Sequence, residues 1–315
     1  MDENYYQEEI IAAVPVEELE RELTPERRLR VTNKACNEIY VIDAHTCPAT
    51  MREIGRLREV SFRTAGGGTG KKCDIDEFDT MEPACRQLLV WNPEAREIIG
   101  AYRYILGSDI RFTPEGTPRI ATAHMFRFSD TFLAHFLPVT IELGRSFVRP
   151  EYQSTRAGSK AIFALDNLWD GLGALTVIHP EVQYLFGKMT MYPSYDRDCR
   201  DLLLCFLELY FHDNDRLVTP IDPLYTTEQL EPLRHLFVGN DFKEDYRRLN
   251  TRIRQAGINI PPLVNAYMQL SPTMRLLGTA VNHEFGEVEE TGILIKIDEI
   301  ADAKKSRHID TFSPQ

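Results

Sequence analysis

Residues 141–160 hold the side chains of this chain that are best suited to chemistry. Glu142 and Arg145 interrupt an otherwise apolar run, and a carboxylate held in a cleft can accept a proton. If the run is a strand, alternation puts Glu142 and Gly144 on one face and Leu143 and Arg145 on the other. A structural salt bridge or a charged sheet edge would explain the same pair. The segment therefore predicts either a general base or a structural ion pair.

A loop of small residues follows this run and opens a predicted helix. Small side chains leave backbone N–H groups accessible, and the start of a helix adds roughly half a positive charge. Together they predict a site for phosphate or pyrophosphate, and a plain helix N-cap is the alternative. The loop has neither the GxxxxGK[ST] nor the GxGxxG pattern. The small residues are Ser154, Thr155, Gly158 and Ser159, and the nearby cations are Arg149, Arg156 and Lys160.

The elements that must position these residues follow from the periodicity of the apolar side chains. The patterns predict an antiparallel meander, with a hairpin turn at residues 92–94, followed by a strand–helix–strand unit. The glycine run at 66–70 ends the first long helix, and the polar tail after Ala303 is expected to fray. Strands are predicted over residues 37–43, 87–91, 97–106, 139–148, 183–191, 276–281 and 292–297, and helices over 48–63, 159–171, 198–211 and 261–270, with a loose helix over 5–23 broken at Pro15.

The composition excludes several classes of protein. The formal net charge of −12 argues against nucleic acid as the main partner, because nucleic-acid-binding proteins usually carry a basic excess. The six cysteines form no CxxC pair and no zinc-like spacing with histidine, so we expect free thiols and no metal site. The first residues lack the apolar region of a signal peptide, and no run reaches the roughly 18 apolar residues of a membrane helix. We expect a cytoplasmic protein, at most peripheral to the inner membrane.

Four blocks of sequence resemble one branch of the GNAT superfamily, in the order found there. They cover most of residues 50–298, and the third block is the most specific. The chain is similar to the hemolysin-like branch, which includes the carrier-protein-dependent ornithine and glycine N-acyltransferases of bacterial aminolipid synthesis. It is also similar to the acyl-homoserine-lactone synthases. The blocks are Arg56–Arg63 with Asp74–Asp79, Cys85–Val90 with Ile99–Arg103, Glu142–Tyr152, and Ile260–Tyr267.

The resemblance implies an α/β (α+β) GNAT fold, in which a central mixed, mostly antiparallel sheet is flanked by helices and carries a helical insertion. Two central strands would splay apart and hold the phosphopantetheine arm of the acyl donor. The implied division of the chain is an N-terminal helical extension at 1–36, an acyltransferase core at 37–211, the insertion at 212–260, a completing helix and strands at 261–302, and a flexible tail at 303–315.

The resemblance also implies roles for individual residues. Glu142 helps to activate the acceptor amine, and Arg145 follows it in the shared motif. Arg156 stands where many GNAT enzymes have a glycine, which fits the single phosphate of a carrier protein better than coenzyme A. The implied donor site comprises Phe147, Val148, Arg149, Ser154, Thr155, Arg156, Gly158, Ser159 and Lys160, and the implied acceptor pocket comprises Arg56, Phe62, Asp74, Asp76, Asp79 and Arg103.

The implied activity is transfer of a fatty or 3-hydroxy fatty acyl group from acyl carrier protein to the α-amine of an amino acid, with glycine or ornithine favoured. The amine attacks the thioester directly, a backbone N–H near Phe147 or Val148 stabilises the oxyanion, and neither Cys73 nor Cys85 is needed as a nucleophile. No permanently bound cofactor is expected, and the donor is a thioester of acyl carrier protein or of coenzyme A. A basic rim of Arg149, Arg156, Lys160 and Lys188 would receive the acidic carrier, with a solvated surface as the alternative for Lys188.

Other functions stay open at this point. The expected partners are acyl carrier protein and the amino acid, with no nucleic acid, and with membrane contact through the lipid product. The alternatives are an acyl-homoserine-lactone synthase, an acetyl-CoA-dependent enzyme, and a non-catalytic lipid- or protein-binding module. The residues do not distinguish glycine, ornithine, serine and lysine as acceptors.

Overall fold

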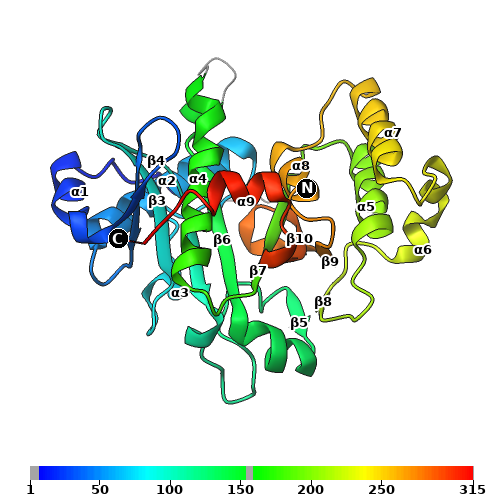
Figure 1. Ribbon diagram of the computed structural model, residues 1–315, viewed down its shortest axis with the longest axis horizontal. Coiled ribbons are helices and arrows are strands. Elements are labelled where there is room, and N and C mark those ends of the chain that lie inside the picture. The colour runs from blue at the N-terminus through cyan, green and yellow to red at the C-terminus, as the bar shows by residue number, and fades with distance from the viewer. Residues whose placement is uncertain (1–6, 154–158, 315) are drawn as a thin grey trace. The chain divides into compact units, whose positions relative to one another are not determined.

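The computed structural model describes residues 7–153 and 159–314, and the side chains of residues 159–162 and 227 lie outside that description. The chain forms two compact units, whose elements are labelled in Figure 1. The first unit draws on Met1–Ala121, Val139–Gln183 and Asp302–Gln315, and the second on Thr122–Pro138 and Tyr184–Ala301. Each unit is therefore assembled from segments that are far apart in the sequence.

The first unit contains an antiparallel sheet in the order β1-β2-β3-β4-β6. The predicted hairpin turn is confirmed, since Asn92 Oδ1 accepts hydrogen bonds from the backbone N–H groups of Glu94 (3.0 Å) and Ala95 (3.1 Å). The first strand was not predicted, because it is short, half exposed and rich in arginine. The strands are β1 (Arg28–Val31), β2 (Glu38–Ile42), β3 (Arg86–Asn92), β4 (Glu97–Leu106) and β6 (Thr140–Val148).

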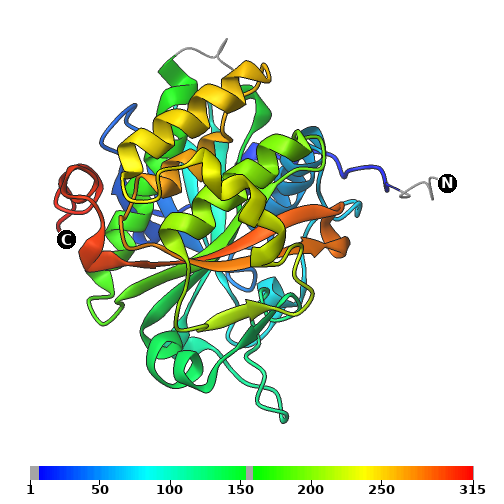
Figure 2. The same ribbon diagram turned by 90° about the vertical axis from the view of Figure 1, so that its right-hand side faces the viewer.

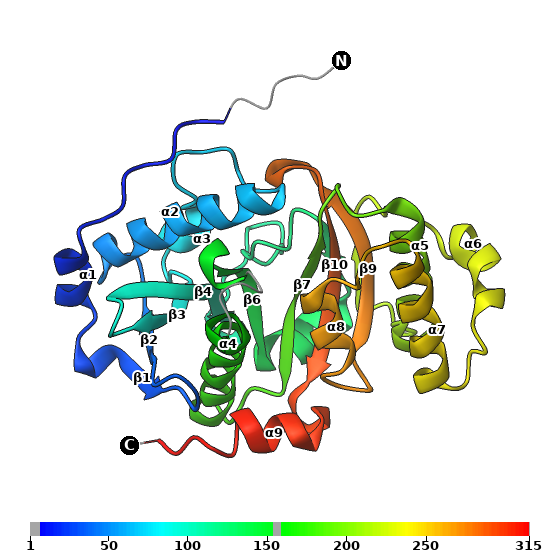
Figure 3. The ribbon, with the colours of Figure 1, turned by 90° about the horizontal axis from the view of Figure 1, so that it is seen from above.

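Two helices, α2 (Pro48–Ala65) and α4 (Ser159–Ile178), cover opposite faces of this sheet, as Figure 3 shows. Neighbouring residues of a strand point to opposite faces. On β3, Gln87 accepts a hydrogen bond of 2.8 Å from Arg58 of α2. The next residue, Leu88, lies against Gly171 of α4, where an added Cβ would overlap the leucine. The face under α4 is therefore apolar at this point, whereas the face under α2 receives charged side chains.

The N-terminal segment differs from the loose helix predicted over residues 5–23. Only α1 (Val16–Glu22) is helical, and it begins directly after Pro15. Residues 7–15 are extended, and their backbone pairs with the loop that follows α2. The N–H of Glu8 donates to the Gly70 carbonyl (2.8 Å) and the N–H of Ile11 donates to the Lys72 carbonyl (3.1 Å).

The C-terminal segment also differs from prediction, because the expected flexible tail begins with helix α9 (Asp302–His308) beside α4 (Figures 1 and 3). His308 is buried, and its Nδ1 lies 2.7 Å from Asp170 Oδ1 of α4. Asp170 also accepts hydrogen bonds of 2.8 Å from the backbone N–H and the side chain of Asn33. A polar sequence is ordered here because its polar groups find partners on the first unit.

The second unit has a three-stranded antiparallel sheet in the order β7-β10-β9 and a two-stranded pair of β5 with β8. Figure 2 shows α7 beside α5, and their contact is aromatic, with Phe206 5.4 Å from Phe242 and 6.4 Å from Tyr246 between ring centroids. The elements are β5 (Phe126–Phe128), β7 (Tyr184–Met191), α5 (Arg197–Phe211), β8 (Val218–Pro220), α6 (Thr227–Leu230), α7 (Phe242–Gln255), α8 (Pro262–Met268), β9 (Arg275–Asn282) and β10 (Val288–Lys296).

The predicted fold class is confirmed, since antiparallel strands and covering helices recur in both units. Every strand and helix expected from residue 37 to residue 297 is present, although α4 continues seven residues beyond its predicted end at 171 and β10 begins four residues before its predicted start at 292. The division of the chain into five segments stays a prediction. Within the described residues, no helix combines the length and the apolar character required to cross a bilayer.

Candidate active site

A bulge in β6 is the first feature of the candidate site. In the pairing with β4, Gly144 lies opposite Arg103 and Phe147 lies opposite Ala101, so β6 has one residue more than its partner between these pairs. Arg145 adopts the left-handed conformation there, with φ at 51°. An extra residue of this kind bends a strand and redirects its side chains.

The bulge corrects the predicted orientation of Arg145. Strict alternation would put Arg145 on the face opposite Glu142, but Arg145 Nε lies 2.9 Å from Asp74 Oδ2 and Arg145 Nη2 lies 3.6 Å from Asp76 Oδ2. Glu142 pairs with Ile105 two positions before the bulge, and it therefore shares the α2 face with Arg103. The side chains of Glu142 and Arg145 consequently lie on the same face of the sheet.

Helix α3 (Glu77–Thr80) brings the two acidic residues of the loop to this face. Asp76 caps the helix, since its side chain accepts from the N–H groups of Phe78 (3.0 Å) and Asp79 (3.2 Å). The Asp79 carboxylate accepts from the Asp76 N–H in return (3.1 Å). This reciprocal capping fixes both carboxylates relative to the backbone. Asp76 then meets Arg103 at 2.6 Å.

Behind this layer, Asp79 is held by a fully buried guanidinium. Arg58 of α2 lies 2.9 Å from Asp79 Oδ2, and it also donates to the Asp74 carbonyl at 3.0 Å. Gln87 donates to Asp79 Oδ1 at 2.9 Å. The side chains of Arg58 and Asp79 are 0% exposed, so their charges depend on each other. The charge cluster, as named from here on, comprises Arg58, Asp74, Asp76, Asp79, Arg103, Glu142 and Arg145.

Neighbouring opposite charges shift the pKa values of two members of the charge cluster, Asp79 and Arg103. Burial by itself would raise the pKa of Asp79, but Arg58 and Arg103 lie close enough to bring that pKa below its ordinary value. Burial would likewise lower the pKa of Arg103, but Asp79 and Asp76 raise it well above its ordinary value. Three guanidiniums therefore face four carboxylates on one face of the sheet.

The edge of β6 beyond the bulge is the candidate donor side. The Arg149 N–H donates to the Ile99 carbonyl of β4 at 2.9 Å. Because successive N–H groups of a strand alternate between its edges, the Val148 N–H points away from β4. Phe147 lies on the α2 face, where its ring meets Phe62 edge-on at 6.4 Å. The Val148 N–H is therefore not used in the pairing of β6 with β4.

The structure brings some of the residues predicted for the site together and places others elsewhere. It joins Asp74, Asp76, Asp79, Arg103 and Arg145 by ion pairs, places Glu142 on the same face of the sheet by the register of β6, and sets Phe62 against Phe147. It does not bring Arg56 there, because Arg56 donates instead to Glu53 at 2.6 and 2.8 Å. Ser154, Thr155, Arg156 and Gly158 lie outside the described residues, and Ser159 and Lys160 are placed only by their backbone at the start of α4.

The predicted basic rim is wrong in two of its members. Arg149 pairs with Glu97 and lies 3.3 Å from Glu151. Lys188 is 10% exposed and pairs with the buried Glu290, so neither a rim nor a solvated surface describes it. Both cations are neutralised within the fold.

Sequence reasoning missed two members of the polar core, Arg58 and Gln87. A signal for Arg58 exists, because it follows Ile54 by one helical turn and lies seven residues after Met51, on the apolar stripe of α2. A charged residue on an apolar stripe indicates a buried partner. Gln87 carries no comparable local signal, since its partners come from α2 and α3.

The two cysteines nearest the charge cluster are poor nucleophiles. Burial raises the pKa of Cys85 to about 12 and that of Cys73 to about 11. A thiol that stays protonated at neutral pH does not attack a thioester. This agrees with the expectation that neither cysteine forms an acyl-enzyme.

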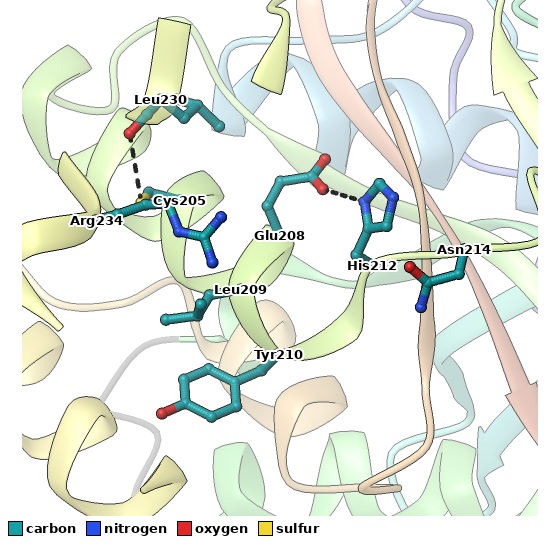
Figure 4. Close-up of a pocket in the computed structure, with 8 residues that line it drawn as sticks. All are labelled: Cys205, Glu208, Leu209, Tyr210, His212, Asn214, Leu230 and Arg234. Carbon is teal, nitrogen blue, oxygen red and sulfur yellow. Dashed lines mark hydrogen bonds and ion pairs between the residues drawn. The ribbon is translucent and has the colours of Figure 1, made fainter. Parts of the chain in front are cut away.

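A pocket of about 410 Å³ lies within the second unit, and Figure 4 shows its lining. Glu208 is the central carboxylate, and it accepts from Tyr225 (2.8 Å) and meets His212 Nδ1 at 2.7 Å. None of the residues predicted for the site lines this pocket. Its lining consists of Cys205, Glu208, Leu209, Tyr210, His212, Asn214, Leu230 and Arg234.

Comparison with known proteins agrees with the fold and with the order of the motifs. Residues 57–161 match the family described as Acetyltransferase (GNAT) domain. A glycine N(alpha)-acyltransferase of Bacteroides thetaiotaomicron is 64% identical over 97% of this chain and 90% of its own. The enzyme of the same name from Phocaeicola vulgatus is 61% identical over 98% of this chain and 94% of its own. An L-ornithine N(alpha)-acyltransferase of Brucella abortus is 26% identical over 77% of this chain and 75% of its own.

The matched region of the GNAT model contains α3, β3, β4 and β6, and it includes every member of the charge cluster. The two glycine enzymes match both units, from the N-terminal segment to the second sheet. The chain is an acyltransferase, and it belongs to the GNAT N-acyltransferase family of these glycine N(alpha)-acyltransferases.

Proposed function

We propose that the protein transfers a fatty acyl group from a thioester to the α-amine of glycine. Two glycine N(alpha)-acyltransferases that share more than 60% of its residues support glycine over ornithine, whose enzymes share 26%. The acylation of a free amino acid by a fatty acid would be the first step of aminolipid or N-acyl amino acid synthesis. The amphiphilic product would bring the enzyme into contact with a membrane.

The observation that carries this proposal is the charge cluster at the bulge of β6. The carboxyl groups of the cluster outnumber its guanidinium groups by four to three, and the pKa shifts of Asp79 and Arg103 favour their charged forms, so the cluster favours a cationic ligand such as an ammonium group. Arg145 is 17% exposed, whereas the side chain of Arg103 is only 1% exposed. Arg145 is therefore the guanidinium that can reach the carboxylate of the amino acid. A zwitterion matches both features.

Glu142 is the proposed general base. The amino acid arrives as an ammonium ion, and one proton must move to Glu142, directly or through a water, before the nitrogen can attack. The amine nitrogen then forms a bond to the thioester carbonyl carbon, and the Val148 N–H stabilises the oxyanion. Collapse of this intermediate breaks the C–S bond, and the leaving thiolate takes up the second proton, which the nitrogen releases as the amide forms. A base of this kind contributes about 10²–10⁴ in rate.

The proposed donor is a phosphopantetheine thioester on an acyl carrier protein, carrying a fatty or 3-hydroxy fatty acyl group. Support comes from Arg156, which stands where a coenzyme A pyrophosphate would need a close backbone approach. The phosphate would lie at the start of α4, where the backbone N–H groups and the helix dipole favour an anion. Coenzyme A thioesters are the alternative donors, and no bound cofactor is required.

The test is a mass-spectrometric assay of the purified protein with a 3-hydroxypalmitoyl group on acyl carrier protein or on coenzyme A, and with all twenty amino acids plus ornithine as competitors. We expect N-acylglycine as the main product and a faster reaction with the carrier protein. Glu142→Gln should lower the rate at neutral pH by about 10²–10⁴. Glu94→Gln, an exposed carboxylate in the β3–β4 turn, is the matched control and should keep the parent rate.

Two outcomes would contradict the proposal. If no N-acyl amino acid forms with either donor, the acceptor assignment fails. If Glu142→Gln turns over at the parent rate with an unchanged pH profile, the base assignment fails, although the acceptor could still be glycine. An N-acylornithine product would move the assignment to the other branch of the family.

A further inference from the structure

The glycine run at residues 66–70 forms a loop that the proposed mechanism does not use. Gly66, Gly68 and Gly70 have φ angles of 95°, 101° and 74°, which residues other than glycine rarely adopt. The glycines therefore allow the backbone to follow a path that is unfavourable for other residues. This path leads from the end of α2 to Asp74 and Asp76.

A buried carboxylate of α2 holds the loop at its centre. Glu59 is 0% exposed, and it accepts hydrogen bonds from both the backbone N–H (2.9 Å) and the hydroxyl of Thr69. Glu59 also accepts a hydrogen bond of 2.6 Å from Arg63 Nε. Arg63 in turn donates to the carbonyls of Lys71 and of Glu8, the latter at 2.7 Å. The Glu59–Arg63 pair thus ties the loop to the N-terminal segment.

The loop is fixed again where it reaches the charge cluster. The Asp74 N–H donates to the Gly55 carbonyl of α2 at 3.0 Å. The approach is close, since a Cβ added at Gly55 would lie 2.6 Å from Cys73 Sγ. Only four residues separate this contact from Thr69. The contacts at Thr69 and at Gly55 thus hold the two ends of one short segment, and its far end carries Asp74, which pairs with Arg145.

We propose that Glu59 and Thr69 are positioning residues for the acceptor site. By holding the glycine-rich loop, they set Asp74 and Asp76 at the distances at which these carboxylates meet Arg145 and Arg103. This inference rests on the proposed function, because it takes the charge cluster as the site of the acceptor amino acid. If Thr69 had a purely structural role, its substitution would lower the stability of the protein but would not change the KM for the acceptor more than the KM for the donor.

The test compares Thr69→Val with Thr69→Ser. Valine keeps the size of threonine but removes the hydroxyl that meets the buried carboxylate, whereas serine retains it. Loss of a hydrogen bond to a charged group corresponds to roughly a tenfold to hundredfold effect. We expect Thr69→Val to raise the KM for glycine about tenfold or more, with the KM for the acyl donor within twofold of the parent. Thr69→Ser should recover most of the parent value.

Thr64→Val is the matched control. Thr64 is exposed near the end of α2, and its hydroxyl donates to the Val60 carbonyl of the same helix at 2.7 Å. The same chemical change there should leave both KM values unchanged. Hydrogen exchange followed by mass spectrometry gives a second readout, and Thr69→Val should accelerate exchange at residues 69–76 without affecting α4.

The outcomes separate this inference from the proposed function. Three results would overturn the positioning role but leave acyl transfer to glycine intact. Thr69→Val could change the KM values for glycine and for the acyl donor equally, or it could change neither. Thr69→Ser could also fail to recover the parent KM for glycine. A parent enzyme that acylates no amine would overturn both. If exchange at 69–76 is unchanged in Thr69→Val, the contact with Glu59 does not hold the loop, whatever the kinetics.

Discussion

Removing one partner of the buried pair formed by Arg58 and Asp79 should destabilise the first unit strongly. Both side chains are 0% exposed and lie 2.9 Å apart. Loss of one partner leaves an uncompensated buried charge, which costs about 3–5 kcal/mol of the free energy of unfolding. For a unit of roughly 150–250 residues, this lowers the melting temperature by about 6–20 °C.

The two single variants should differ in the size of this effect. In Arg58→Met, Asp79 keeps its hydrogen bonds from Gln87 (2.9 Å) and from the Asp76 N–H (3.1 Å), and Arg103 remains at 3.4 Å. In Asp79→Leu, by contrast, Arg58 and Arg103 lose their shared carboxylate. We therefore expect Arg58→Met near the lower end of the range and Asp79→Leu near the upper end. The double variant should lose less than the sum of the two, because each single change already breaks the pair.

Urea unfolding followed by tryptophan fluorescence measures this directly. The two tryptophans of the chain, Trp91 and Trp169, both belong to the first unit, so the signal reports on the unit that contains the pair. Strict additivity in the double variant, or a loss below about 1 kcal/mol in Asp79→Leu, would refute the reasoning that these charges depend on each other.

Three further predictions follow from contacts of the first unit. The folded state holds the pKa of Asp79 below its ordinary value, so in acid it binds fewer protons than the unfolded state. The free energy of unfolding should therefore be constant near neutral pH and fall as the pH drops below about 4. Asp79→Asn should flatten this acidic part of a plot of the urea midpoint against pH. At pH 8, iodoacetamide should modify the exposed Cys36 well before Cys85, whose pKa burial raises to about 12, as peptide mass spectrometry would show; equal rates would contradict the burial of Cys85. Gly173→Ala should release α9, because the new Cβ would overlap the His308 carbonyl, and limited proteolysis should then cut the C-terminal segment at least several times faster than in the parent.

Local pattern predicted those parts of the fold whose cause is local. The hairpin at residues 92–94 depends on Asn92 and its immediate neighbours, and helix α2 follows from an apolar stripe. The orientation of Arg145 could not be predicted in this way. It depends on a register shift of β6 against β4, where Phe147 meets Ala101 and Gly144 meets Arg103, and alternation along β6 alone contains no sign of it.

Long-range partners explain the other failures. The polar sequence after Ala303 predicts a frayed tail, because nothing local shows that His308 packs against Asp170, 138 residues earlier. Arg58 was assigned no role because a charged side chain on a helix is usually solvated, and its partners Asp79 and Gln87 come from other elements. Asp76 and Asp79, by contrast, were assigned to the acceptor pocket from the family resemblance, and the cap that fixes them became visible only in the structure.

The docking of α9 on α4 has a consequence for how the protein is made. Chains emerge from the ribosome N-terminus first, and domains generally fold in that order. Here the last element of the first unit begins at Asp302, after the whole of the second unit in the sequence. Asp170 can therefore contact His308 only when the second unit has been synthesised. A nascent chain therefore carries an incomplete first unit throughout its translation. Premature termination between residues 179 and 301 leaves a first unit whose α4 lacks its C-terminal partner, and such fragments should be preferred substrates for cellular proteases.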